Sequence, residues 1–277
     1  PHPEHLTRFY LAMSVGGVLG GIFCAIVAPL VFDWTYEHPI LIIASALLLA
    51  PRAIFESSQR LLEGANKRAV RAAIALVALL SAVAASGTLM DHTPGFVQPI
   101  AAVIVIIAAV AVLGYRPLFA FCLGCLMLTL NGWQKIALSL EPGMMTRSYF
   151  GVYSVRSNGV DTRYLVHGTT VHGVQNLNPA RQTQPTSYYA PNSGIGLAMK
   201  AAPEIYGPAA RIDIVGLGAG TLACYARPGQ SWTFYEIDPA IVTIASDPKR
   251  FTFLSECLPD ARIVIGDARL TLAATGP

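Results

Sequence analysis

Charged residues are scarce in this chain. They make up 13% of its 277 residues, whereas soluble domains carry roughly 25%. The deficit is uneven, because residues 72–90 and 93–115 contain no Asp, Glu, Lys or Arg at all. This pattern excludes a wholly soluble protein and indicates a membrane part joined to a more ordinary part. The sequence also lacks a basic cluster with interleaved aromatic residues, so nucleic acid is not an expected partner.

Cysteine is infrequent and scattered. Cys24, Cys122 and Cys125 lie in apolar runs, whereas Cys224 and Cys257 lie in the C-terminal half. Cys122 and Cys125 have the spacing of a redox motif, but not its usual position at the junction of a strand and a helix. We favour small apolar packing residues over a redox or metal-binding role, and we predict no metal site.

Long apolar runs fill the first half of the chain. A membrane-spanning helix needs roughly 20 mostly apolar residues, and five stretches reach or approach that length. They are Phe9–Phe32, Trp34–Ala50, Val70–Met90, Phe96–Leu113 and Pro117–Leu138. The sequence therefore predicts a multi-pass α-helical membrane domain over residues 1–140, in the lipid bilayer of an inner or plasma membrane.

The first apolar run is rich in glycine. Gly16, Gly17, Gly20 and Gly21 form two overlapping pairs of small residues four positions apart, a spacing that lets a neighbouring helix approach closely. The Gly16–Gly21 face is therefore a candidate contact for other membrane helices or subunits. The alternative is that this membrane helix simply tolerates glycine.

Strand and turn signals replace the apolar runs after Pro142-Gly143. The dipeptide Asn158-Gly159 is a hairpin signal, and the segments around it are rich in β-branched and aromatic residues. A small antiparallel β-hairpin domain is expected over residues 147–176, with strands at Tyr149–Val155, Thr162–His167 and Thr169–Val174.

Residues 187–277 have the pattern of an α/β domain. A helix is expected at Ile195–Lys200, and the apolar strand Ile212–Val215 runs directly into a glycine-rich loop containing Gly216, Gly218 and Gly220. Glycines are needed at such a loop because the backbone must turn tightly and let a ligand approach the helix that is expected to follow. The third glycine comes two residues after the second, which suits a methyltransferase-type site better than a dinucleotide site.

Two further strands end in acidic residues. Trp232–Tyr235 is followed by Glu236 and Asp238, and Arg262–Ile265 by Gly266, Asp267 and Ala268. With the three loop glycines, Glu236, Asp238, Asp267 and Ala268 are the residues expected to bind the nucleoside. An acid about 20 residues after the first glycine is placed to accept hydrogen bonds from ribose hydroxyls, and Asp267 could accept one from an adenine amino group. The sequence predicts the first half of a class I methyltransferase-like, Rossmann-type domain. The alternative is an α/β sheet whose glycines only make turns.

These segments resemble the spermidine-synthase superfamily, specifically the membrane-fused spermidine-synthase-like proteins. The segments that carry the resemblance are Phe150–Val152, His167–Gly173, Tyr188–Gly194, Gly216–Thr221, Glu236–Asp238, Gly266–Arg269 and, ahead of the first span, His5–Tyr10. The resemblance implies a small β-domain, a nucleoside site in a doubly wound domain, and acids that hold a polyamine. It implies S-adenosylmethionine or decarboxylated S-adenosylmethionine as the cofactor.

The chain departs from that family where the amine should bind. Ala219 stands where the family has an Asp in the glycine-rich loop, and Ala190 and Pro191 follow Tyr189 in place of the family's polar pair. Between residues 151 and 208 the only acids are Asp161 and Glu204. The family's catalytic Asp follows a fourth strand and is expected beyond residue 277, so the catalytic residues stay unassigned.

Two side chains are candidates for contacting a substrate. His172 could act as an acid or base at neutral pH, and Tyr189 could stack on adenine or substrate, although packing would explain it equally well. His167 and His172 are five residues apart, and on that spacing we expect them on opposite faces of the strands.

Two functions from different classes fit these observations. The first is a membrane-anchored spermidine-synthase-like protein that binds S-adenosylmethionine, its decarboxylated form or methylthioadenosine, and that is an aminopropyl or alkyl transferase if it is active. The second is a non-catalytic membrane subunit or transporter that carries a degenerate synthase-like module.

The charge of the connectors predicts the side of the membrane that each one faces. Residues 51–71 carry five Lys or Arg against two Glu, so the positive-inside rule makes them cytoplasmic; within them Ile54, Phe55, Leu61 and Leu62 suggest a short surface helix. Three further spans would put the α/β domain on the opposite side. Because the cofactor is made in the cytosol, we nevertheless expect a cytoplasmic domain, with the span at Trp34–Ala50 or at Pro117–Leu138 miscounted.

Overall fold

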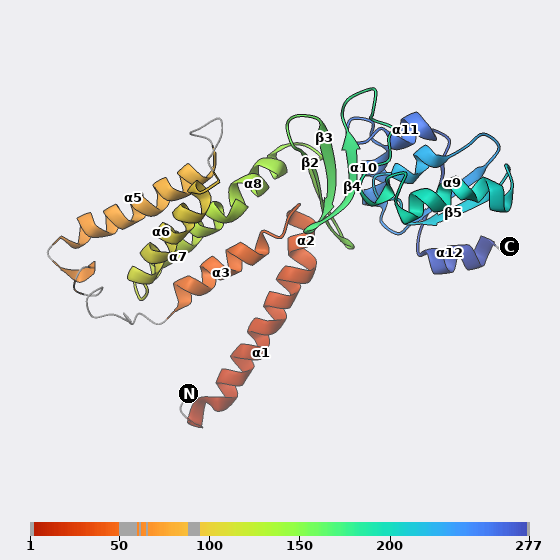
Figure 1. Ribbon diagram of the computed structural model, residues 1–277. Helices are drawn as coiled ribbons and strands as arrows, with labels where there is room; N and C mark the ends of the chain where they lie inside the picture. Colours follow the sequence, from red (N-terminus) through yellow and green to blue (C-terminus); the bar gives the residue numbers. More distant parts are fainter. Residues whose placement is uncertain (1–2, 50–59, 61, 65, 88–94, 276–277) are drawn as a thin grey trace. The chain divides into compact units, whose positions relative to one another are not determined.

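The computed structural model describes residues 3–49, 60, 62–64, 66–87 and 95–275. The chain forms two compact units, Pro1–Glu141 and Pro142–Pro277 (Figure 1). We call them the helical unit and the α/β unit and describe each by itself.

The helical unit consists of apolar helices. In chain order its elements are η1 (Pro3–His5), α1 (Leu6–Ile22), the π-helical η2 (Phe23–Val27), α2 (Ala28–Val31), α3 (Glu37–Leu48), α5 (Lys67–Ala85), α6 (Val97–Ala111), α7 (Arg116–Met127), the π-helical η3 (Leu128–Gly132) and α8 (Trp133–Leu140). Several of these elements continue one another. Elements α1, η2 and α2 form one helix, and α7, η3 and α8 form a second that is interrupted at Leu130 and Asn131, whose backbone angles are not helical.

Three of these helices are long and apolar enough to cross a membrane, namely Leu6–Val31, Lys67–Ala85 and Arg116–Leu140. The other two predicted spans correspond to shorter apolar helices, α3 with 12 residues and α6 with 15. The predicted surface helix near Ile54 and Phe55 lies outside the described residues. Leu62, from the same connector, is buried against α5, α6 and α7.

Small buried residues hold α5, α6 and α7 together. Ala78, Val105 and Cys122 come from the three helices in turn, are fully buried and belong to one cluster. Small side chains let the helix backbones approach closely, which favours van der Waals packing between apolar helices. Cys122 and Cys125 are unpaired and buried in this cluster, in agreement with the expected packing role.

The glycine face of α1 is uncovered within the described residues. A Cβ atom built on Gly16, Gly17, Gly20 or Gly21 would meet nothing within 4 Å, and α1 buries none of its residues. The proposed role of this face as a contact for other helices therefore stays a prediction.

The α/β unit begins with a four-stranded antiparallel sheet in the order β1-β2-β3-β4. Its strands are β1 (Met145–Ser148), β2 (Gly151–Ser157), β3 (Thr162–His167) and β4 (Thr170–Asn176). Three strands were predicted near these positions, and β1 is an addition. The sequence Met-Thr-Arg-Ser of β1 has no alternation of apolar and polar residues that would predict a strand. It forms one because it pairs with β2, so that the neighbouring strand and not its own residues decides its structure.

A three-stranded parallel sheet follows in the order β5-β6-β7. The remaining elements are η4 (Ser187–Tyr189), α9 (Gly194–Tyr206), β5 (Arg211–Val215), η5 (Thr221–Tyr225), β6 (Ser231–Glu236), α10 (Pro239–Ser246), α11 (Phe253–Cys257), β7 (Arg262–Ile265) and α12 (Ala268–Thr275). The helix expected after the glycine-rich loop is only the short 3-10 turn η5. It stops at Ala226, whose backbone is extended, just before Arg227 and Pro228, where a helix would be interrupted.

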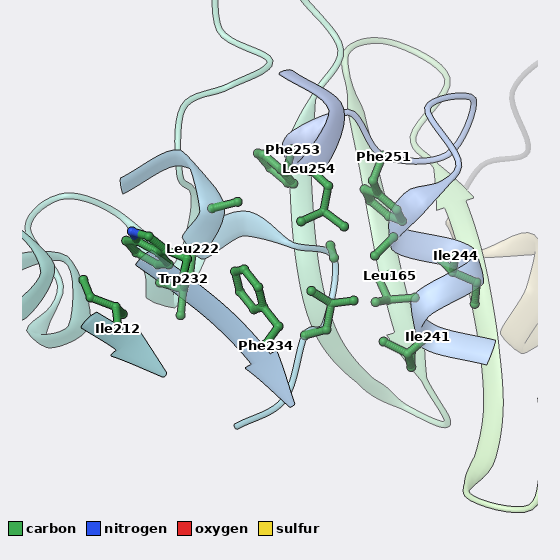
Figure 2. Close-up of a cluster of buried hydrophobic side chains, with 14 of the residues drawn as sticks. Leu165, Ile212, Leu222, Trp232, Phe234, Ile241, Ile244, Phe251, Phe253 and Leu254 are labelled. Carbon is green, nitrogen blue, oxygen red and sulfur yellow. The ribbon is translucent and has the colours of Figure 1, made fainter. Parts of the chain in front are cut away.

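Both sheets share one hydrophobic core. Leu165 of β3 packs in the same buried cluster as Phe234 of β6 and Ile244 of α10 (Figure 2). Phe251 and Phe253 are fully buried in this cluster. The small β-sheet and the parallel sheet therefore belong to a single compact unit, and the antiparallel sheet is held beside the carboxyl end of the parallel one.

Candidate functional site

The glycine-rich loop leaves β5 at the carboxyl edge of the parallel sheet. Gly216, Gly218 and Gly220 have φ angles of 93°, 56° and 82°, all in the region that favours glycine. A Cβ atom on Gly220 would lie 2.9 Å from the Leu254 side chain of α11. The loop therefore requires glycine both for its backbone conformation and for its close packing on α11.

Glu236, at the end of β6, ties this loop to the sheet. Its side chain is buried, and one carboxylate oxygen accepts a hydrogen bond from the backbone N–H of Leu217 at 2.8 Å. The other oxygen accepts one from the N–H of Asp238 at 3.0 Å. Each carboxylate oxygen can accept two hydrogen bonds, so both keep capacity for a ligand hydroxyl.

Asp238 is already engaged by the protein. It is the N-cap of α10, accepting a hydrogen bond from the Ala240 N–H at 2.9 Å. Its other oxygen accepts one from the Ser148 hydroxyl at 2.5 Å. Burial, followed by the hydrogen bond and the charge of Asp238, raises the pKa of Tyr153, so this phenol stays protonated and donates to the carboxylate. These contacts hold the site together, and the predicted role of Asp238 in binding the nucleoside stays a prediction.

Asp267 follows β7 at the same edge of the sheet. One of its oxygens accepts a hydrogen bond from the Arg269 N–H at 2.8 Å, and the side chain is half-buried. Ala268 is the first residue of α12 and is also half-buried. Because parallel strands end at one edge, the ends of β5, β6 and β7 bring the glycine loop, Glu236 and Asp267 together.

Strand β4 closes over the glycine-rich loop from the other sheet. A Cβ atom on Gly173 would lie 2.4 Å from the Cβ of Ala219, and one on Gly218 would lie 3.3 Å from the carbonyl oxygen of His172. The Tyr188 hydroxyl donates to this same carbonyl at 2.9 Å. The antiparallel sheet therefore forms one wall beside the loop.

The two tyrosines after β4 stand together. The rings of Tyr188 and Tyr189 have centroids 4.3 Å apart, and the Tyr225 hydroxyl of η5 donates to the Tyr189 carbonyl at 2.6 Å. Burial, with the Tyr189 hydrogen bond second, raises the pKa of Tyr188. The Tyr189 segment is thus attached to the turn that follows the glycine loop.

The expectation that His167 and His172 face opposite sides was wrong. Their ring centroids are 5.6 Å apart, and His167 also lies 4.6 Å from the Tyr153 ring. The two residues belong to different strands of a hairpin, in which His167 stands opposite Thr170, so counting along a single strand misplaces them. Burial, and then the proximity of His167, lowers the pKa of His172, which favours a neutral ring that can accept a proton.

Several residues near this edge had no sequence signal that marked them. Ser148 and Tyr153 were missed because their role depends on reaching Asp238 from β1 and β2. Thr221 has a hydroxyl that is buried and has no hydrogen-bond partner among the described residues. Cys224 and Cys257 form a disulfide with their Cα atoms 4.8 Å apart, joining η5 to α11 directly behind the glycine loop.

Acidic side chains are sparse on the antiparallel wall. Asp161 lies in the β2–β3 turn, where hydrogen bonds from Thr162 and Asn158 lower its pKa, and Glu204 is exposed on α9. A polyamine would therefore find little negative charge on residues 151–208. Across the part of the chain that the structure describes, no three His, Cys, Asp or Glu side chains are grouped to hold a metal ion.

No family model matches the chain, and neither the curated proteins nor the solved structures contain a match to it.

Proposed function

We propose that this is a membrane-anchored protein whose α/β unit binds an adenine nucleoside of the S-adenosylmethionine class. The ligands are S-adenosylmethionine, decarboxylated S-adenosylmethionine or methylthioadenosine. The observation that carries the proposal is the order β5-β6-β7, in which consecutive strands of a half-sheet end in a glycine loop, Glu236 and Asp267. Doubly wound folds bind nucleosides at this edge.

Each residue at the edge has a role in this proposal. Glu236 accepts from the ribose hydroxyls with the capacity left on its two oxygens, and Asp267 accepts from the adenine amino group. Gly216, Gly218 and Gly220 let the backbone approach the ligand closely. The buried, unpartnered hydroxyl of Thr221 adds a polar contact at the end of the loop.

The reaction class that suits these ligands is alkyl or aminopropyl transfer, as in spermidine synthases. An amine lone pair attacks the carbon beside the sulfonium, a C–N bond forms, the C–S bond breaks to leave a neutral thioether, and a base takes the amine proton. Holding amine and sulfonium in line would supply most of the rate. His172 and Tyr189, on the wall beside the loop, are the side chains proposed to contact the amine substrate.

Calorimetry of the full chain in detergent tests the nucleoside proposal. We expect saturable binding of at least one of the three ligands, and we expect Glu236→Gln or Asp267→Asn to weaken it roughly 10- to 100-fold, as the loss of a hydrogen bond to a charged group does. Glu204→Gln, on the exposed face of α9, is the matched control and should bind like the unchanged chain. No binding of any of the three at millimolar concentration would sink the proposal.

A second candidate function is that of a non-catalytic membrane subunit or transporter, in which the helical unit performs the function. The observation that favours it is the break between α7 and α8, where Asn131 has a φ of 72° and lines a cleft of about 900 Å³ with Trp34, Lys135 and apolar residues of α3 and α7. Interrupted helices beside a cavity are typical of transporter binding sites.

Uptake into proteoliposomes tests this second candidate, with labelled methylthioadenosine and spermidine as the probes. We expect uptake of at least one of them to be lost in Asn131→Val, because a β-branched residue disfavours a positive φ, and kept in Asn131→Gly. Unchanged uptake in Asn131→Val, or none by the unchanged chain, would speak against transport through this cleft.

The expected cytoplasmic placement of the α/β unit rests on where S-adenosylmethionine is made. The Lys and Arg residues of the connectors and the Cys224–Cys257 disulfide point instead to the non-cytoplasmic side of the membrane.

A further inference from the structure

One end of the helical bundle joins the start of α5 to the hairpin between α6 and α7. The Arg71 guanidinium donates to the Leu62 carbonyl at 3.0 Å and to the Tyr115 hydroxyl at 3.0 Å, and it lies 4.0 Å from the centre of the Tyr115 ring. Leu62 and Tyr115 therefore lie at the same end of the bundle.

The other end joins the end of α5, the start of α6 and the region of α8. The Trp133 ring N–H donates to the Ala82 carbonyl at 2.9 Å, and the Gln98 amide donates to the Thr129 carbonyl at 3.1 Å. Helices α5, α6 and α7 thus run side by side and alternate in direction (Figure 1). Although α6 is short, it connects opposite ends of the bundle.

The residues before α3 belong to this second end. The Ser139 hydroxyl of α8 donates to the Asp33 carboxylate at 2.9 Å and shares a hydrogen bond of 2.8 Å with the Tyr36 hydroxyl. The last residue of α8, Leu140, leads from this end into the α/β unit. The chain therefore leaves the helical unit at the end opposite Arg71 and Tyr115.

Basic residues are concentrated at the first end. Among the described residues it contains Arg60, Lys67, Arg68, Arg71 and Arg116. Residues 33–38, at the second end, contain no Lys or Arg, and the sequence 91–95 between α5 and α6 contains none either. Lys135 of α8 is a cation near the second end, with its ammonium 5.5 Å from the Trp34 ring. By the positive-inside rule the first end is cytoplasmic, and the point where the α/β unit is attached is not.

The disulfide points to the same side on chemical grounds. Cys224 and Cys257 are 33 residues apart and joined within the α/β unit. Disulfides persist in oxidising compartments and are rare where cellular thiols keep proteins reduced. The disulfide is independent of the charge of the connectors and of the number of membrane spans.

We infer that the α/β unit lies on the non-cytoplasmic, oxidising side of the membrane, where Cys224 and Cys257 are joined. A nucleoside site on that side meets nucleosides that have left the cytosol rather than the pool from which polyamines are made. The inference stands independently of nucleoside binding.

Labelling of introduced cysteines in intact cells tests the placement. Val160→Cys puts a thiol in the β2–β3 turn of the α/β unit, at a side chain that is 84% exposed, and Asn66→Cys puts one at the exposed start of α5 without removing a basic residue. A membrane-impermeant maleimide should label Val160→Cys in intact cells, and Asn66→Cys only after lysis. The unchanged chain reports background from its own cysteines.

The reverse labelling pattern overturns the placement, as does labelling of both positions only after lysis. The oxidation state of Cys224 and Cys257 is measured separately. Cells are quenched in acid, and free thiols are alkylated with a maleimide of high mass. We expect the unchanged chain to gain two alkylations when a reductant is added before the maleimide. The Cys224→Ser/Cys257→Ser chain should gain none. Alkylation of the pair without reductant contradicts an oxidising location. Neither readout involves a nucleoside, so its failure is distinct from failure of nucleoside binding.

Discussion

Replacing Cys224 and Cys257 together by serine should lower the free energy of unfolding of the α/β unit by about 3–4 kcal/mol. The disulfide closes a loop with a sequence separation of 33 residues, and a loop of that size restricts the unfolded chain by roughly this amount. Urea unfolding of the full chain in detergent measures it through the fluorescence of Trp232, which is buried in the α/β core. A Trp232→Phe chain serves as the blank for the other tryptophans.

Two comparisons interpret that result. Cys24→Ser, in the π-helical part of the first helix, should leave the Trp232 transition unchanged, and adding a reductant to the unchanged chain should reproduce the double serine variant. A double variant as stable as the parent would mean that the pair is not joined in the folded protein. The disulfide would then no longer support an oxidising location of the α/β unit.

The Asp238→Ala substitution should destabilise the α/β unit by roughly 3–7 kcal/mol, measured by the same transition. The variant loses the N-cap of α10, which typically contributes about 1 kcal/mol. It also leaves the hydroxyls of Ser148 and Tyr153 without their acceptor, and each unsatisfied buried group costs about 1–3 kcal/mol. Both groups meet Asp238 from the antiparallel sheet, so the loss should also loosen β1 and β2.

The matched control is Asp238→Asn, which keeps a capping oxygen and the shape of the side chain. We expect it to cost clearly less than Asp238→Ala. If the two variants are equally stable, the contacts of Asp238 with β1 and β2 do not stabilise the unit. If Asp238→Asn is as stable as the parent but binds no nucleoside, Asp238 contacts the ligand, as the sequence predicts.

The strands and the loop of the α/β unit followed from local patterns. The segments 212–215, 232–235 and 262–265 are apolar and flanked by turn residues, and the structure has strands at all three. Gly216, Gly218 and Gly220 were recognisable because a positive φ strongly favours glycine. Such features depend on neighbouring residues, so that a short window of sequence contains the information.

Other features could not be read along the chain. The polar strand β1 forms because it pairs with β2. His167 and His172 face one another because a hairpin lies between them. In each case the outcome depends on a contact between segments, and no periodicity within either segment encodes it.

The sequence by itself determined that half of this protein is apolar helix and that the other half carries a glycine loop with acids after two later strands. Composition and residue spacing suffice for both, since burial in lipid and tight turns restrict which residues can stand at each position. Only the tertiary structure decided that Asp238 is occupied by Ser148 and Tyr153, that Cys224 pairs with Cys257, and that Leu140 leaves the bundle opposite Arg71. These depend on distances between residues far apart in the chain, which folding sets through packing of the whole unit.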